Sequence, residues 1–133
     1  MKVNVIIEQN TEGKYFTYID NNDLDFGLNG YGETVDDAKK DILLAYDEMK
    51  ELYAEENKSI PELEFEYRFD VASFLEYYAK VLSMAGLERL TGVAQDQLSH
   101  YVTGRRKPSP KTVKKMEKSL HDFADEIKQI QFI

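Results

Sequence analysis

The chain has no cysteine among its 133 residues. Disulfide bonds, thiolate catalysis and cysteine-ligated zinc are therefore excluded. It also has no apolar run near the ~20 residues that a membrane-spanning helix needs. The apolar stretch near the N-terminus is too short for the core of a signal peptide. We therefore expect a soluble, cytoplasmic protein with no membrane partner.

What the chain does contain argues for a folded protein. Hydrophobic residues make up 42% of it, and 9 Tyr and 7 Phe supply large side chains for a core, which argues against disorder. Its length allows one ordinary domain or two small ones. Small domains bury only ~60% of the surface that their unfolded chains expose, so we expect a homodimer or higher homo-oligomer.

Charge is divided unevenly along the chain. Residues 1–69 carry 7 basic and 17 acidic side chains (net −10), whereas residues 70–133 carry 10 basic and 8 acidic ones (net +2). Between Ser99 and Lys118, seven basic residues stand against the single acid Glu117. Taken alone, this window would be a solvated lysine-rich helix face. The asymmetry nevertheless indicates two partners of opposite charge.

In the first half of the chain, apolar and polar residues alternate as in β-strands, and the apolar residues then recur at the spacing of a helix. Apolar alternation predicts three strands and, after a helix, a fourth, with Gly13 suited to a hairpin turn. Thr34 is a good N-cap for the helix. The expected strands cover 3–7, 15–20, 26–30 and 63–69, and the helix covers 34–56. The pattern is β-β-β-α-β, with one long helix on one face of a small sheet. We expect Glu8, Glu64 and Glu66 on the wet strand faces.

In the second half of the chain, the spacing of apolar residues predicts helices only. We place the domain boundary at Phe69/Asp70 because a helical period begins there. Gly86 interrupts this period, a short helix covers 87–91, another covers 94–102, and Ser109-Pro110 opens the last one. Apolar residues expected on the first helical face are Leu75, Tyr78, Val81, Leu82 and Ala85; those expected in the core stripe of the last helix are Val113, Met116, Leu120, Phe123 and Ile127. The fold class predicted is α+β: a small sheet-and-helix module (1–69) followed by an all-α helix-turn-helix domain (70–133).

Two short helices joined by Gly92 are typical of a helix-turn-helix. Val93 and Leu98 are spaced to wedge the second helix against the first. This arrangement leaves polar residues on the exposed side or N-terminal end of the second helix, and their types can bind base edges in DNA. The predicted base-reading residues are Gln95, Asp96, Gln97, Ser99 and His100. An ordinary helical hairpin with its polar side in water would show the same pattern.

The segment that follows resembles the XRE/Cro repressor family. There a Gly-Arg/Lys-x-x-Pro-Ser loop leads to a capped helix, matched here by Gly104 to Ser109. Glu88 and Ala94 stand where that family usually has a small residue and a Ser or Thr N-cap. The resemblance implies binding to double-stranded operator DNA, with the loop and next helix holding phosphates. The predicted phosphate-binding residues are Arg105, Arg106, Lys107, Ser109, Lys111 and Lys115.

The first half, taken together with this second half, resembles the HicB family of antitoxins. The shared pattern is a Val/Ile-rich strand, a Gly turn, an aromatic strand, a third strand and then Thr34-Val-Asp-Asp-Ala38 at the start of a long helix. The resemblance implies a truncated ribonuclease-H-like fold. It also implies an antitoxin and autorepressor that neutralises a small basic, mRNA-cleaving HicA-type toxin. Asp23 to Gly27 replaces the family's usual Asp-x-Pro-Gly-Cys loop, so no toxin-contact residues are transferred.

Enzymatic residues are not evident. The acids that are candidates for Mg²⁺ binding fall in an expected loop and helix cap, where acids have ordinary roles; they are Asp20, Asp23, Asp25, Asp36 and Asp37. The chain has no Gly-rich phosphate loop or plausible nucleophile triad. We expect no catalytic residue, metal or cofactor, and a divalent-dependent nuclease is a less favoured interpretation.

Two non-enzymatic interpretations stay open beside the antitoxin. The chain could be a solitary DNA-binding regulator whose first module only dimerises or senses a ligand. It could also be a pure protein-interaction module whose helix-turn-helix does not bind DNA. A short basic reading frame beside this gene would favour the antitoxin, and its absence would favour the solitary regulator.

Overall fold

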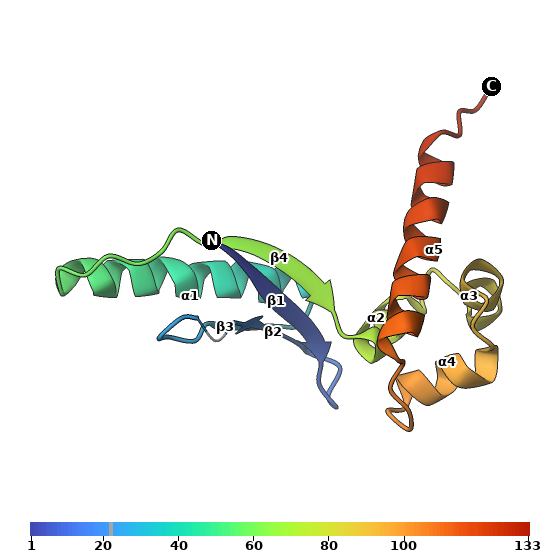
Figure 1. The fold of residues 1–133 in the computed structure, drawn as a ribbon, viewed down its shortest axis with the longest axis horizontal. Coiled ribbons are helices and arrows are strands. Elements are labelled where there is room, and N and C mark those ends of the chain that lie inside the picture. Colours follow the sequence, from blue (N-terminus) through green and yellow to red (C-terminus); the bar gives the residue numbers. More distant parts are fainter. Residues whose placement is uncertain (22) are drawn as a thin grey trace. The chain divides into compact units, whose positions relative to one another are not determined.

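The chain divides into two compact units, Met1–Asp70 and Val71–Ile133. The structure, a computed structural model, describes residues 1–21 and 23–133 (Figure 1). The loop predicted at 21–23 includes Asn22, which lies outside the described residues. A four-stranded sheet and five helices are described, so the predicted α+β class is confirmed. No helix within these described residues is long and apolar enough to cross a membrane.

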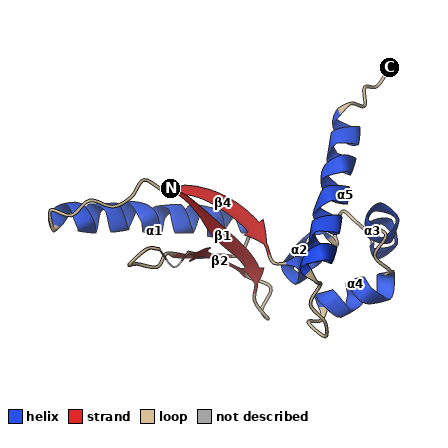
Figure 2. Ribbon diagram, viewed as in Figure 1, coloured by secondary structure: helices blue, strands red, loops and turns tan. Residues whose placement is uncertain are grey.

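The first unit has the predicted β-β-β-α-β order. Its elements are β1 (Lys2–Gln9), β2 (Tyr15–Asp20), β3 (Asn29–Gly32), α1 (Val35–Glu55) and β4 (Glu64–Phe69). The sheet order is β3-β2-β1-β4, with β1 antiparallel to β2 and parallel to β4. The helix α1 covers one face of the sheet (Figure 2). The third strand begins later than the predicted residue 26.

Strand alternation and helix capping create the core of this unit. Val3, Val5 and Ile7 on β1 are fully or almost fully buried, and the other face of β1 is more exposed, as a period of two requires. Thr34 caps α1 by accepting a hydrogen bond from the backbone N–H of Asp37 (3.1 Å). The buried core cluster between α1 and the sheet contains Val5, Leu28, Ile42 and Tyr46.

The helix α1 packs closely against β3 because β3 is glycine-rich. A Cβ atom on Gly30 would lie 2.4 Å from the carbonyl oxygen of Ala38 and 2.4 Å from Oγ1 of Thr17. Thr17 is buried, and its hydroxyl donates a hydrogen bond to that same Ala38 carbonyl (2.9 Å). A polar contact therefore ties the sheet to the helix at a point where only glycine fits.

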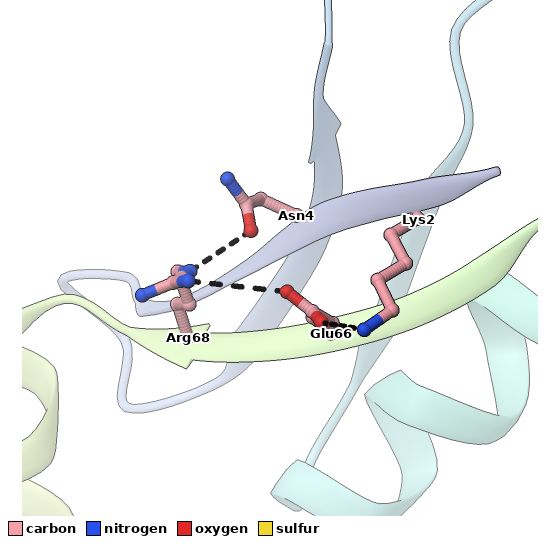
Figure 3. A network of polar contacts seen from close by, with 4 residues as sticks. All are labelled: Lys2, Asn4, Glu66 and Arg68. Atoms are coloured by element: carbon pink, nitrogen blue, oxygen red, sulfur yellow. Dashed lines mark hydrogen bonds and ion pairs between the residues drawn. The ribbon is translucent and has the colours of Figure 1, made fainter.

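The opposite face of the sheet carries a polar network across β1 and β4 (Figure 3). The Nε of Arg68 donates to Oδ1 of Asn4 (2.8 Å). The Glu66 carboxylate lies 3.5 Å from the Lys2 ammonium and 3.9 Å from the Arg68 guanidinium. Glu66 is only partly exposed, and so is Glu8, which accepts a hydrogen bond from the Tyr18 hydroxyl (2.8 Å). Glu8, Glu64 and Glu66 thus lie on the face opposite the core, as predicted, and Glu8 and Glu66 each have a partner on a neighbouring strand.

The second unit is entirely helical in its regular structure. Its elements are α2 (Val71–Tyr78), α3 (Met84–Thr91), α4 (Gln95–Val102) and α5 (Pro110–Lys128). The predictions for Gly86 and Val81 were wrong. Gly86 does not interrupt the helix: it lies in the first turn of α3, which Ser83 caps by accepting from the Gly86 N–H (3.0 Å). Val81 is not a core residue: α2 ends at Tyr78, and Val81 is 71% exposed in the connecting turn.

The core of the second unit is formed by residues from all four helices and the turn before α4. It contains Leu75, Leu87, Val93, Leu98, Tyr101 and Met116. Phe74, Leu82 and Leu120 are partly buried and pack against this cluster. Because α3, α4 and α5 share the cluster, their relative positions within the unit are fixed by apolar burial.

Candidate nucleic-acid interface

A left-handed glycine joins α3 to α4. Gly92 has φ +73°, which glycine adopts at little cost, and its N–H donates to the Glu88 carbonyl (2.8 Å). The buried Thr91 fixes the turn a second time: its hydroxyl donates to the Leu87 carbonyl (2.7 Å) and accepts from the Val93 N–H (3.1 Å). Thr91 was not among the residues predicted from the sequence, although a threonine before a helix-ending glycine is suited to such back-bonding.

The helix α4 is held by three buried residues. Val93, Leu98 and Tyr101 are at most 8% exposed and pack with Leu87 of α3. Because Leu98 and Tyr101 occupy one side of α4, and Val93 packs beside them from the preceding turn, the other side of α4 faces solvent. The polar side that the sequence predicts is therefore available to a ligand.

The predicted base-reading residues are not equally placed on α4. Gln95, Asp96 and Ser99 are exposed. Ser99 follows Asp96 by three residues and Gln95 by four, so it lies on the same side of the helix as both. Gln97 and His100 are partly buried. The structure thus brings three of the five predicted residues together on the most exposed face of α4, and the other two, Gln97 and His100, are less exposed.

Asp96 already has a structural task. Ala94 is the N-cap residue of α4 and makes no side-chain cap hydrogen bond. The Asp96 carboxylate instead accepts a hydrogen bond from the Gln97 N–H (3.0 Å). A carboxylate is favourable in the first turn of a helix because it meets the positive end of the helix dipole.

The basic loop leaves α4 through a second left-handed glycine. Gly104 has φ +76°, and the N–H of Arg106 returns to the His100 carbonyl (3.2 Å), which fixes the loop against the end of α4. The side chains of Arg105, Arg106 and Lys107 are exposed. Three exposed cationic side chains therefore lie in the loop that follows the C-terminal end of α4.

The start of α5 completes this surface. Ser109 is its N-cap and accepts a hydrogen bond from the Thr112 N–H (3.2 Å), so its hydroxyl is already engaged by the helix. Lys111 is exposed in the first turn. Lys115 is placed differently, because a Cβ on Gly92 would lie only 3.1 Å from its Nζ. Its ammonium therefore lies at the C-terminal end of α3, where the helix dipole favours a positive charge.

The acids considered for metal binding do not form a site in the described part of the chain. Among residues 1–21 and 23–133, no group of three or more His, Asp or Glu side chains is placed to hold a metal ion. Asp25 accepts a hydrogen bond from the Tyr53 hydroxyl (3.1 Å).

Comparison with known families supports the geometry of the second unit. Residues 79–121 match a family model described as Helix-turn-helix; this span contains α3, α4 and the first part of α5. The match supports a DNA-binding transcriptional regulator. No curated protein and no solved structure matches the chain. The family match covers no residue of the first unit, where the resemblance to HicB stays a prediction.

Proposed function

We propose that this regulator is a HicB-type antitoxin and autorepressor. As a dimer it binds a palindromic operator in its own promoter through the second unit, and its acidic first unit neutralises a small basic ribonuclease toxin. The observation that carries the DNA-binding part is the combination, within one unit, of an exposed polar face on α4 and the exposed cations of the loop that follows it.

On this proposal the two sets of residues have different tasks. Contacts to phosphates position a protein on DNA, whereas contacts to base edges give it sequence preference. Gln95, Asp96, Gln97, Ser99 and His100 face the bases, with Gln95 and Ser99 best exposed for direct hydrogen bonds. Arg105, Arg106, Lys107, Ser109, Lys111 and Lys115 hold the phosphates.

The first experiment separates these tasks. Arg105→Ala/Arg106→Ala should weaken binding to every DNA sequence and reduce the salt dependence of the affinity, because fewer counterions are released. Gln95→Ala should instead lose ~1–3 kcal/mol of preference for the operator over altered sites. Lys39→Ala/Lys40→Ala, which removes the same charge from α1, is the matched control. If this control lowers the salt slope as much as the arginine variant does, the loop is not the phosphate-binding segment.

The acidic surface of the first unit lies mainly on α1 rather than on the strands. This helix carries seven Asp or Glu residues and three Lys residues. Leu44 and Leu52 are exposed on it, and the exposed acids Glu48 and Glu51 lie between them at helical spacing. Such a face suits a basic partner with an apolar patch, because complementary charge raises the association rate while apolar contact supplies binding energy.

The second experiment tests this partner. The product of the adjacent gene should be captured by the chain, and its RNA-cleaving activity should stop. Glu48→Lys/Glu51→Lys should slow capture by about tenfold or more at low salt. Glu12→Lys/Glu62→Lys makes the same change in net charge at exposed positions outside α1, and should slow capture less. If no basic ribonuclease is encoded nearby, the solitary regulator becomes the better interpretation. If one is captured at an unchanged rate by Glu48→Lys/Glu51→Lys, this face of α1 is not where the partner binds.

A further inference from the structure

The apolar stripe of α5 continues beyond the core that it serves. Met116 is buried and Leu120 packs against the same cluster. At the same spacing, Phe123 is only partly buried and Ile127 is 48% exposed. The prediction that Ile127 lies in the core was therefore wrong. Within the second unit, the C-terminal half of α5 runs past the other three helices (Figure 1).

The spacing of this stripe is that of a coiled-coil seam. Met116, Leu120, Phe123, Ile127 and Ile130 follow one another at intervals of four, three, four and three residues, which is the alternation of the two seam positions in a heptad. The turn continues through Ile130, whose N–H donates to the Ile127 carbonyl (3.1 Å). Ile130 is 51% exposed.

We propose that Phe123, Ile127 and Ile130, termed here the α5 seam, pair in parallel with the same residues of a second copy of this chain. Three exposed or half-exposed apolar side chains on one helical line bury themselves most simply against an identical line. The seam needs no other partner because it is self-complementary under a two-fold axis.

The residues beside the seam favour a second copy in the parallel orientation. In a parallel pair, Ser119 lies opposite Ala124 of the partner helix, and these small residues allow close approach. Glu126 then lies near the end of the partner's α5 at Lys128, and residues 129–133 that follow carry no acidic side chain. In an antiparallel pair with Phe123 against Ile127, Glu126 would face its own copy, which is unfavourable. The charge pattern therefore selects the parallel arrangement.

A parallel pair also suits the proposed operator binding, on which this part of the inference rests. It places both α4 helices at the same end of the paired α5 helices, as two half-sites of one duplex require. A seam of about two turns is short, so we expect weak pairing of the free chain. Binding of both copies to one operator strengthens it through effective concentration.

Cross-linking tests the seam directly because the chain has no native cysteine. Under mild oxidation Ile130→Cys should form a covalent dimer, since facing seam positions come within disulfide distance. Asp125→Cys, on the opposite side of the helix line, should stay monomeric. Cross-linking of Asp125→Cys but not of Ile130→Cys would overturn the parallel seam.

A second pair of variants measures the dimer without covalent bonds. Ile127→Asp should raise the dimer dissociation constant, measured by analytical ultracentrifugation, at least about tenfold, with an unchanged melting temperature. The control is Leu43→Asp, because Leu43 is similarly exposed, at 46%, on a helix of the other unit. An unchanged dimer in Ile127→Asp overturns the seam. If the dimer forms through the seam and still binds no DNA, the proposed function fails while the seam stands.

Discussion

Individual glycines set how closely α1 approaches the sheet. A Cβ on Gly30 would meet the backbone of α1, with the Ile42 nitrogen at 2.6 Å in addition to the Ala38 oxygen at 2.4 Å. A Cβ on Gly32 would lie 2.7 Å from the Ala38 nitrogen. Backbone atoms of a helix cannot move aside as a flexible side chain can, so these two positions define the separation of helix and strand.

Gly30→Ala should therefore destabilise the first unit by about 1–3 kcal/mol or more, the usual cost of overpacking a core. Urea unfolding monitored by circular dichroism measures the change. The control is Gly27→Ala, where a Cβ meets no described heavy atom within 4 Å and φ is not left-handed; this variant should be neutral or slightly stabilising. Equal stabilities for the two variants would show that α1 does not contact β3 as described.

The ionisation of Tyr18, on the sheet face opposite the core, makes the stability of the first unit depend on pH. Burial, followed by the hydrogen bond and the charge of Glu8, raises the pKa of Tyr18 from its ordinary value of 10.0 to about 12. Folding therefore favours the neutral phenol. The associated stability is complete below pH 10 and is lost as the pH rises through about 12.

Tyr18→Phe should remove this alkaline loss of stability, and the latest step of tyrosinate formation should disappear from an absorbance titration. Glu8→Gln should lower the pKa of Tyr18 while leaving the contribution of burial. Glu64→Gln is the control on an exposed glutamate of the same sheet and should not change the titration. A Tyr18 that ionises at its ordinary pKa in the unmodified protein would contradict the described hydrogen bond.

At the scale of elements, three helices of the second unit begin with similar N-cap dihedrals but different side chains. Ser83 and Ser109 each accept a hydrogen bond from the N–H three residues on. Ala94 has φ −61° and ψ 146°, close to the serine caps, yet has no side-chain oxygen. The backbone at the start of α4 therefore has the dihedral angles of a capped helix, but no side chain at residue 94 can accept the cap hydrogen bond.

Ala94→Ser should stabilise the second unit, by less than about 1 kcal/mol, and Ser83→Ala should destabilise it by about 1 kcal/mol. Thermal unfolding measures both. The gain at Ala94 should be smaller than the loss at Ser83, because Asp96 already accepts from the Gln97 N–H. A destabilised Ala94→Ser variant would mean that residue 94 has a packing role absent from the described contacts.

Local chemistry explains which elements were predictable. The starts of α1 and α5 follow from Thr34 and Ser109, whose caps act within four residues of chain. The start of α3 was missed because Gly86 resembles a helix breaker, whereas its N–H completes the Ser83 cap. The apolar spacing also extended the predicted helix too far, to Val81. In the structure α2 ends in a local turn, in which the N–H groups of Val81 and Leu82 both donate to the Tyr78 carbonyl.

The candidate site was predictable in outline and not in detail. The wedge of Val93 and Leu98 follows from their spacing, and the basic loop from composition. That the Asp96 carboxylate accepts a hydrogen bond within its own helix depends on side-chain rotation, which the sequence does not specify. The position of Lys115 beside Gly92 depends on how α5 packs against α3, a contact between residues 23 positions apart.

For the whole molecule, the separation of charge between the units is the dominant feature. Residues 1–70 carry 7 basic and 18 acidic side chains (net −11), and residues 71–133 carry 10 basic and 7 acidic ones (net +3). The field of the acidic unit acts on any polyanion that approaches the second unit, over a Debye length of ~30 Å at 0.01 M salt and ~8 Å at 0.15 M. The first unit should therefore suppress non-specific DNA binding, and a basic partner bound to it should relieve that suppression.

Residues 71–133 alone, which have their own core, should thus bind random-sequence DNA more tightly than the full chain at low salt. The difference should shrink as salt rises, because screening removes the long-range repulsion but leaves the contacts of the second unit intact. Full-length Glu48→Lys/Glu51→Lys, with a net charge of −4 in place of −8, should fall between the two. Fluorescence anisotropy across a salt series measures all three affinities. Equal affinities at low salt would show that the acidic unit exerts no field at the DNA surface, and its charge would then have to act on the partner alone.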